Sequence, residues 1–187
     1  MFILFEGDNG TGKTTIGTYL KKCGYFIITD NREVSAMEIK AKEYPSGSQE
    51  RFDAFLEYNK FVGSHINRAE KVVVIRYWIS TVAASFADGL FPMDRALSIA
   101  NDLYRTMPKP DYIFRLFCDY SVRIARIAER NLTLKNVQDD MSLIRDEKYQ
   151  TILDILSKKI DGWYTINTTY RTPLQVFEEI KTKVEME

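Results

Sequence analysis

The sequence is poor in net charge, in cysteine and in histidine. Lysine and arginine together number 26, as do aspartate and glutamate, so the formal net charge is zero. A chain without excess positive charge offers no general basic surface, which argues against a protein that binds a nucleic acid polymer in that way. The two cysteines, Cys23 and Cys118, are too few for a disulfide scaffold and lack metal-site spacing. We expect both thiols to be reduced and buried, as in a cytoplasmic protein.

Long apolar runs are also missing. The apolar start, Met1 to Phe5, ends at Glu6 and is too short for a signal peptide. No other segment approaches the length of a membrane span, so we expect no membrane partner. The 187 residues, of which 45% are hydrophobic, predict a single domain over 1–187 with a substantial core.

Five short apolar runs punctuate the chain and predict five strands. They are continuous rather than alternating, which indicates strands that are covered on both faces, as in a parallel sheet. The runs are Phe2–Phe5, Tyr25–Ile28, Val72–Ile75, Tyr112–Phe117 and Trp163–Ile166.

Segments with helical spacing lie between these runs. The clearest are 49–69, 149–160 and a helix that begins at Pro173 behind the capping pattern Thr172-x-x-Gln175. Strands that alternate with helices predict an α/β fold with a doubly wound, mostly parallel five-stranded sheet. Ligands bind such sheets at the carboxyl ends of the strands.

The stretch FEGDNGTGKTTI, Phe5 to Ile16, contains the phosphate-binding pattern G-x-x-x-x-G-K-[ST]. It follows a predicted strand and opens a predicted helix, which is the context that the motif requires. Its backbone N–H groups and the helix N-terminus favour a bound phosphate chain. We expect Lys13 to reach the terminal phosphates and Thr14 to bind Mg²⁺. The predicted ATP-binding residues in this loop are Gly7, Asp8, Asn9, Gly10, Thr11, Gly12, Lys13, Thr14 and Thr15.

Four stretches resemble the thymidylate kinase family within the P-loop nucleoside and nucleotide kinases. FEGDNGTGKTT is similar to that family's P-loop, and TDNRE (Thr29 to Glu33) to its T-R-E-P loop. IRYWISTVA (Ile75 to Ala83) resembles D-R-[YH]-x-x-S-x-x-A. PDYIFRLFCDYSVRIARIAER (Pro110 to Arg130) resembles its strand and the helix that leads to a lid. The resemblance implies the nucleotide kinase type of P-loop fold, a lid over about 131–140 and a homodimer.

The resemblance also implies an activity, namely transfer of the ATP γ-phosphoryl group, with Mg²⁺, to a deoxynucleoside monophosphate. A deoxynucleoside is the alternative acceptor, and an ATP-binding module with little turnover is the alternative of another class. Arginines at two places in the sequence suit the transfer. Arg76 follows a strand at the carboxyl edge, where it would clamp an acceptor phosphate. Arg123, Arg126 and Arg130 share one helix face, and the family has arginines at the last two positions.

On the acceptor side we expect Arg32 to hold a monophosphate. Phe55 and Tyr58 lie in the region of the family's acceptor helix, although its F-x-x-x-R pattern has no clean match here, and Tyr77 is either an acceptor contact or a core residue. A monophosphate acceptor is a dianion and needs more than one cation beside the donor phosphates. Arg32 and Arg76 are two such cations, and their presence favours a monophosphate over a nucleoside.

The sequence departs from the family at two acidic positions, where Ile75 and Asn9 replace aspartate. The acid that usually ends the third strand, and that holds Mg²⁺, is therefore missing. We expect Glu33 to approach the metal and Glu6 to take the proton from the acceptor hydroxyl, so Glu6 joins Lys13, Arg76 and Arg126 as a predicted catalytic residue.

Overall fold

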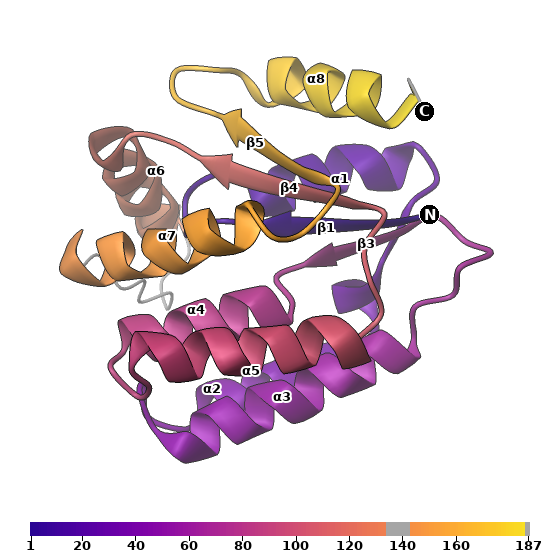
Figure 1. Cartoon of the computed structure of the whole chain (residues 1–187). Coiled ribbons are helices and arrows are strands. Elements are labelled where there is room, and N and C mark those ends of the chain that lie inside the picture. Colours follow the sequence, from indigo (N-terminus) through magenta and orange to yellow (C-terminus); the bar gives the residue numbers. More distant parts are fainter. Residues whose placement is uncertain (134–142, 186–187) are drawn as a thin grey trace.

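The computed structural model of the protein describes residues 1–133 and 143–185. Five strands alternate with helices along the chain, and Figure 1 shows their arrangement. The elements are β1 (Phe2–Glu6), α1 (Lys13–Lys22), β2 (Phe26–Ile27), α2 (Arg32–Lys42), α3 (Gln49–Ser64), β3 (Val72–Ile75), α4 (Trp78–Ala87), α5 (Met93–Thr106), β4 (Tyr112–Phe117), α6 (Tyr120–Thr133), α7 (Leu143–Ser157), β5 (Trp163–Asn167) and α8 (Pro173–Glu185). Among these described helices, none is long and apolar enough to cross a bilayer.

The sheet has the strand order β2-β3-β1-β4-β5, and every neighbouring pair is parallel. Phe2 pairs with Val72 on one side of β1, and Ile3 pairs with Tyr112 on the other. This confirms the predicted α/β class and the parallel five-stranded sheet. Because all strands run the same way, the loops after β1, β3, β4 and β5 meet at one edge of the sheet.

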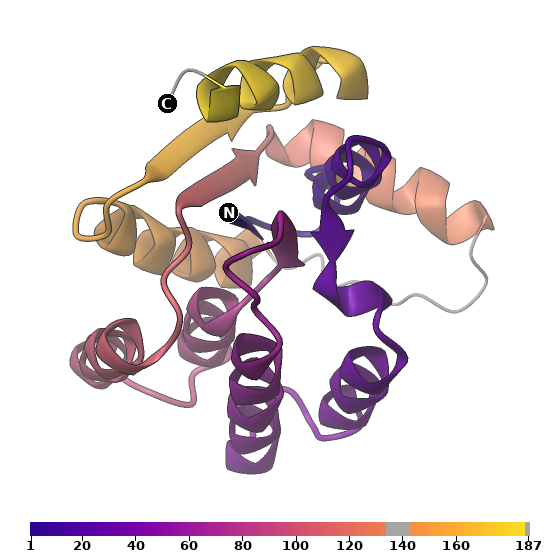
Figure 2. The same ribbon diagram turned by 90° about the vertical axis from the view of Figure 1, so that its right-hand side faces the viewer.

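Side chains of successive strand residues enter two separate cores. Phe2 and Leu4 of β1 pack with Val74 of β3 against α3, α4, α5 and α7. Ile3 and Phe5 point the other way, into a core with α1 and α8. Figures 1 and 2 show the sheet between these two sets of helices. The continuous apolar runs are explained by these two covered faces.

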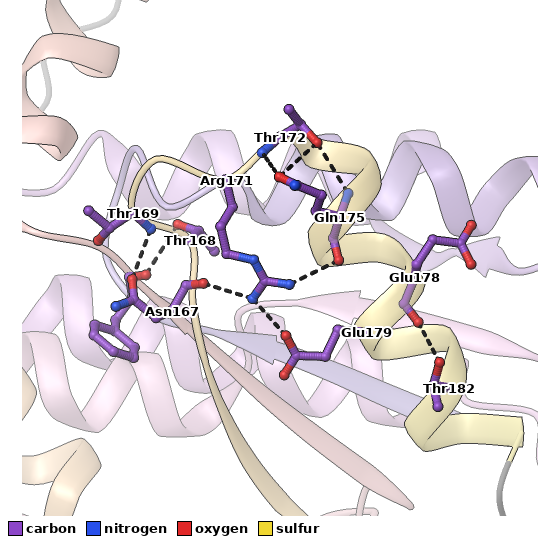
Figure 3. Close-up of polar contacts among 10 residues, drawn as sticks. Asn167, Thr168, Thr169, Arg171, Thr172, Gln175, Glu178, Glu179 and Thr182 are labelled. Carbon is purple, nitrogen blue, oxygen red and sulfur yellow. Dashed lines mark hydrogen bonds and ion pairs between the residues drawn. The ribbon is translucent and has the colours of Figure 1, made fainter.

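The predicted helix over 49–69 ends at Ser64 as α3, and the one over 149–160 is α7, which begins earlier, at Leu143, and ends at Ser157. The capping pattern before α8 is confirmed, because the Gln175 N–H donates to Thr172 Oγ1 at 3.3 Å and the Thr172 N–H donates to Gln175 Oε1 at 2.9 Å (Figure 3). The prediction that both thiols are buried was wrong, because Cys23 is exposed and Cys118 is only half-buried. Most of the predicted lid, about 131–140, lies outside the described residues.

The predicted loop over Thr29–Glu33 is instead a 3-10 turn followed by the first turn of α2. Asn31 is the reason, because its side-chain oxygen caps the helix by accepting from the N–H groups of Glu33 and Val34. Arg32 and Glu33 are therefore helical residues, and both are exposed.

Candidate active site

The loop between β1 and α1 is shaped by three glycines with left-handed backbones, Gly7, Gly10 and Gly12, whose φ angles are 120°, 79° and 96°. A Cβ atom on Gly7 would also lie 2.0 Å from the carbonyl oxygen of Leu116 in β4. Only glycine satisfies both the conformation and this close approach. The loop can therefore lie directly against β4 and turn its backbone toward the helix α1 N-terminus.

Lys13 is nearly fully buried at the start of α1. Its ammonium group donates to the carbonyl oxygens of Gly7, at 2.8 Å, and Asp8. Burial lowers the pKa of Lys13 well below its ordinary value, and the positive charges of Arg76 and Arg130 act in the same direction, against Asp8 and Glu6. A buried ammonium group that is held mainly by carbonyl dipoles is suited to bind a polyphosphate anion.

The loop after β5 contacts the phosphate loop through Thr168. Thr168 is 3% exposed, and its hydroxyl lies 3.2 Å from the Thr11 carbonyl oxygen and 3.1 Å from that of Phe117. Arg126 of α6 donates to the Thr168 hydroxyl at 3.1 Å and to its carbonyl oxygen at 2.8 Å. Figure 3 shows the neighbouring anchor, where the Arg171 guanidinium joins Asn167, Gln175 and Glu179. These hydrogen bonds connect the β5–α8 loop to α6 on one side and to α8 on the other.

Arg76 follows β3 in a left-handed conformation, with φ of 67°, which is unusual for a residue with a side chain. Its N–H donates to the Phe5 carbonyl oxygen at 2.9 Å and continues the sheet. The guanidinium donates to Asn9 Oδ1 at 2.6 Å and to the Tyr149 hydroxyl at 3.2 Å. The strained backbone therefore turns a cation toward the phosphate loop.

A cavity of about 870 Å³ runs along this edge of the sheet. That volume is within the range of small-molecule sites. Its lining comes from the phosphate loop, the β3 end, α2, α6 and the β5–α8 loop. The described lining residues are Asn9, Gly10, Thr11, Gly12, Lys13, Thr14, Thr15, Ile16, Thr29, Glu38, Ile75, Arg76, Arg126, Arg130, Thr168, Arg171, Pro173 and Val176.

The structure therefore brings together most of the predicted donor-side residues, with Arg76, Arg126 and Arg130 around the loop. Two loop residues differ from the others. Gly7 lies behind the cavity against β4, and the Asp8 carboxylate accepts a hydrogen bond from Gln150 of α7. Arg123 also points elsewhere, since it forms a buried ion pair with Asp146.

The predicted acceptor side comes together only at Arg76. Arg32 is exposed at the start of α2 and does not line the cavity. Phe55 and Tyr58 pack on each other, with ring centroids 6.1 Å apart, and Tyr77 is 1% exposed against Phe2. These aromatic rings belong to the core rather than to the cavity surface, because helices α3 and α4 turn their apolar faces toward the sheet.

Glu6 is completely buried and does not line the cavity. One carboxylate oxygen accepts from the Tyr77 N–H at 3.2 Å and the other accepts from the Ser80 hydroxyl. Tyr77 is the N-cap residue of α4 and Ser80 belongs to its first turn, so the carboxylate lies at the N-terminus of that helix. Burial raises the pKa of Glu6 to about 7, against the opposing effects of Ser80, Arg76, Tyr77 and Lys13. Glu6 therefore stands behind Arg76 rather than on the cavity surface, and its role as the base for an acceptor hydroxyl stays a prediction.

The predicted metal ligands are also separated. Thr14 lines the cavity, whereas Glu33 is exposed on α2 and does not. The described lining contains one carboxylate, that of Glu38, which pairs with Lys42 at 2.5 Å. Within residues 1–133 and 143–185 no cluster of three or more acidic, histidine or cysteine side chains could hold a metal ion by itself.

Sequence reasoning missed Thr168, Tyr149 and Glu38. Thr168 and Tyr149 reach the site through tertiary contacts with residues more than 60 positions away in the sequence. Ser80 carried a usable signal, since it occupies the serine position in the stretch that resembles D-R-[YH]-x-x-S.

The chain is similar in sequence to known thymidylate kinases. A probable thymidylate kinase from Methanocaldococcus jannaschii is 26% identical over 175 residues, which cover 86% of this chain and 90% of that protein. A thymidylate kinase from Leptospira interrogans is 26% identical over 201 residues, covering 98% of this chain and 97% of that protein. No family model matches the chain.

Solved structures show the same fold. A thymidylate kinase from Candida albicans superposes with a TM-score of 0.69 at 18% identity, covering 99% of this chain and 91% of the other. A deoxyadenosine kinase from M. mycoides with bound dCTP superposes with a TM-score of 0.66 at 14% identity, covering both chains completely.

The fold is that of the solved nucleoside and nucleotide kinases, and the curated relatives with which the chain aligns over most of its length are thymidylate kinases. Such a protein is an ATP-dependent phosphotransferase. Within that group the chain is a thymidylate kinase-like nucleotide kinase, as its full-length relatives indicate.

Proposed function

We propose that the protein transfers the γ-phosphoryl group of ATP to a deoxynucleoside monophosphate. The observation that carries this proposal is the cavity in which Lys13, Arg76 and Arg126 surround the phosphate loop. Phosphoryl transfer needs little covalent chemistry from the protein, and catalysis comes from positioning and from cations at the transferring group. Three cationic side chains from three different elements meet that need.

The roles of the individual residues follow from their places. Lys13 and the loop N–H groups hold the triphosphate, with Arg126 and Arg130 over the donor half of the cavity. Arg76 lies between the phosphate loop and α7. From there it reaches toward the γ-phosphate of ATP and the phosphate of the acceptor. Thr14 lines the cavity and would supply one oxygen to Mg²⁺, which commonly binds through few protein ligands and would balance the charge of the phosphates. A cytoplasmic location and a homodimeric state remain predictions.

A deoxynucleoside acceptor is the second candidate, and Glu38 favours it. A monophosphate calls for a second cation on the acceptor side, but Arg32 is exposed and lies outside the cavity, whereas Glu38 of α2 lines it. A carboxylate accepts hydrogen bonds from hydroxyl and amino groups and repels a phosphate dianion. The M. mycoides relative in fold is a deoxyadenosine kinase.

Steady-state kinetics on deoxynucleosides and their monophosphates, side by side, decide between the two acceptors. We expect the monophosphates to be preferred and Arg76→Ala to raise their KM and lower kcat, since charge-assisted hydrogen bonds contribute about 1.5–3 kcal/mol. Arg32→Ala is the matched control, because Arg32 is exposed and lies outside the cavity. Preference for the unphosphorylated nucleoside, together with a raised nucleoside KM in Glu38→Gln, would overturn the monophosphate assignment.

A further inference from the structure

A chain of buried polar groups lies behind Arg76. The Arg76 guanidinium contacts the Tyr149 hydroxyl at 3.2 Å, and that hydroxyl lies 2.9 Å from the hydroxyl of Ser80. Ser80 in turn donates to Glu6. Tyr149 is 2% exposed, Ser80 is 6% exposed and Glu6 is fully buried. Four segments, namely β1, the β3–α4 connection, α4 and α7, thus converge on a single cation.

The number of protons fixes the direction of these hydrogen bonds. A serine hydroxyl carries one proton, and while Glu6 is ionised Ser80 gives that proton to its carboxylate. The Ser80 oxygen must therefore accept the proton of Tyr149. Because the Tyr149 proton is used in this way, its oxygen presents lone pairs to the Arg76 N–H group. Each hydroxyl is oriented by the next group, and Glu6 anchors the end of the chain.

Among the described residues, Asn9 and Tyr149 are the hydrogen-bond partners of the Arg76 guanidinium, and the charges of Glu6 and Asp8 also attract it. Its second N–H group reaches Asn9 of the phosphate loop, at 2.6 Å, and this is a contact with a loop that must also receive a nucleotide. The preceding residue is Ile75, which offers no carboxylate. The backbone of Arg76 is itself strained. Tyr149 is consequently the contact that holds the guanidinium from the side of the protein core.

We propose that Tyr149 is a positioning residue for Arg76 in phosphoryl transfer, and that Ser80 and Glu6 keep its hydroxyl in the accepting orientation. This inference rests on the proposed function, because it concerns the same transfer reaction in the same cavity. Tyr149 contacts no reacting atom in this account. Its hydroxyl fixes where the Arg76 charge sits when the γ-phosphoryl group moves.

The first test is Tyr149→Phe, which keeps the ring within the core around α7 and removes the hydroxyl. We expect kcat to fall about tenfold or more, the scale for losing one hydrogen bond to a charged group, while the KM for ATP changes little. Tyr25→Phe is the matched control. It removes another buried tyrosine hydroxyl, one that contacts the sulfur of Met1 far from the cavity, and should leave kcat unchanged.

A double-mutant cycle separates positioning from a merely structural role. In an Arg76→Ala background, Tyr149→Phe should produce no further loss of kcat, because the group it positions is gone. Ser80→Ala should lower kcat in the same direction and should add little to Tyr149→Phe. Thermal melting of each variant shows whether the fold is kept, and Ser80→Ala provides the test if Tyr149→Phe does not fold.

Wild-type kcat in a folded Tyr149→Phe protein, or equal losses in the wild-type and Arg76→Ala backgrounds, would overturn this inference alone. Absence of phosphoryl transfer by the wild-type protein would instead overturn the proposed function, so the two failures are distinguishable.

Discussion

Replacement of Glu6 by glutamine should change how stability depends on pH. Glu6 has an ordinary pKa of 4.5 and a pKa of about 7 in the folded protein, chiefly because it is buried. The folded state therefore holds a proton that the unfolded chain releases between these values, and the free energy of unfolding falls as the pH rises from 4.5 to 7. The difference between the two pKa values corresponds to a fall of about 3 kcal/mol.

Glutamine has the shape of the protonated acid and does not titrate. Its oxygen can accept from the Tyr77 N–H, and its amide, like the protonated acid, can donate to the Ser80 oxygen, so both contacts with α4 can form with the Ser80 hydrogen bond reversed. Glu6→Gln should therefore be as stable as the wild type near pH 4.5 and about 3 kcal/mol more stable above pH 7.

Urea denaturation of both proteins at half-unit steps from pH 4.5 to 8 measures this difference. All other titrating groups are shared, so their contributions cancel when the two curves are subtracted. A difference in the free energy of unfolding that stays constant over this pH range would refute the reasoning, since it would mean that burial does not raise the pKa of Glu6.

Two further predictions concern the phosphate loop and its support. Gly7→Ala should cost about 2 kcal/mol or more in chemical denaturation, because its Cβ would meet the Leu116 carbonyl oxygen at 2.0 Å in a strained conformation. Gly24→Ala, with nothing within 4 Å, should cost only about 1 kcal/mol of strain, and equal costs would contradict the packing argument. Thr168→Val should raise the KM for ATP severalfold by loosening the Thr11 and Arg126 contacts, whereas Thr182→Val, which loses a contact on the exposed side of α8 (Figure 3), should not. Identical KM values for the two threonine variants would show that the β5–α8 loop does not support the phosphate loop.

The sheet and the phosphate loop could be predicted because their signals are local. Each strand is a continuous apolar run, and Gly7 to Thr14 form one uninterrupted motif. The boundaries of β3 and β4 agree with their apolar runs residue by residue. Lys13 and Arg76 followed from their positions after strands that meet at one edge.

The acceptor side could not be predicted in the same way. The single cap at Asn31 turned a predicted loop into the start of α2 and left Arg32 and Glu33 exposed. Tyr149 belongs to the segment 149–160, whose spacing predicts a helix, and its ring packs in the core, but its hydroxyl reaches Arg76 from 73 residues away. Glu6 follows a strand as a catalytic acid would, yet the approach of α4 encloses it. Such outcomes depend on how helices pack, which no local pattern records.

The central claim is that Lys13, Arg76 and Arg126 surround a site where the γ-phosphoryl group of ATP passes to a deoxynucleoside monophosphate. Phosphorus NMR of a mixture of the protein, ATP, Mg²⁺ and each deoxynucleoside monophosphate in turn tests this claim most directly. We predict that ADP and a deoxynucleoside diphosphate appear together in equal amounts with at least one acceptor, and that neither appears with Lys13→Ala. Formation of ADP and free phosphate alone, or equal turnover by Lys13→Ala, would contradict the account.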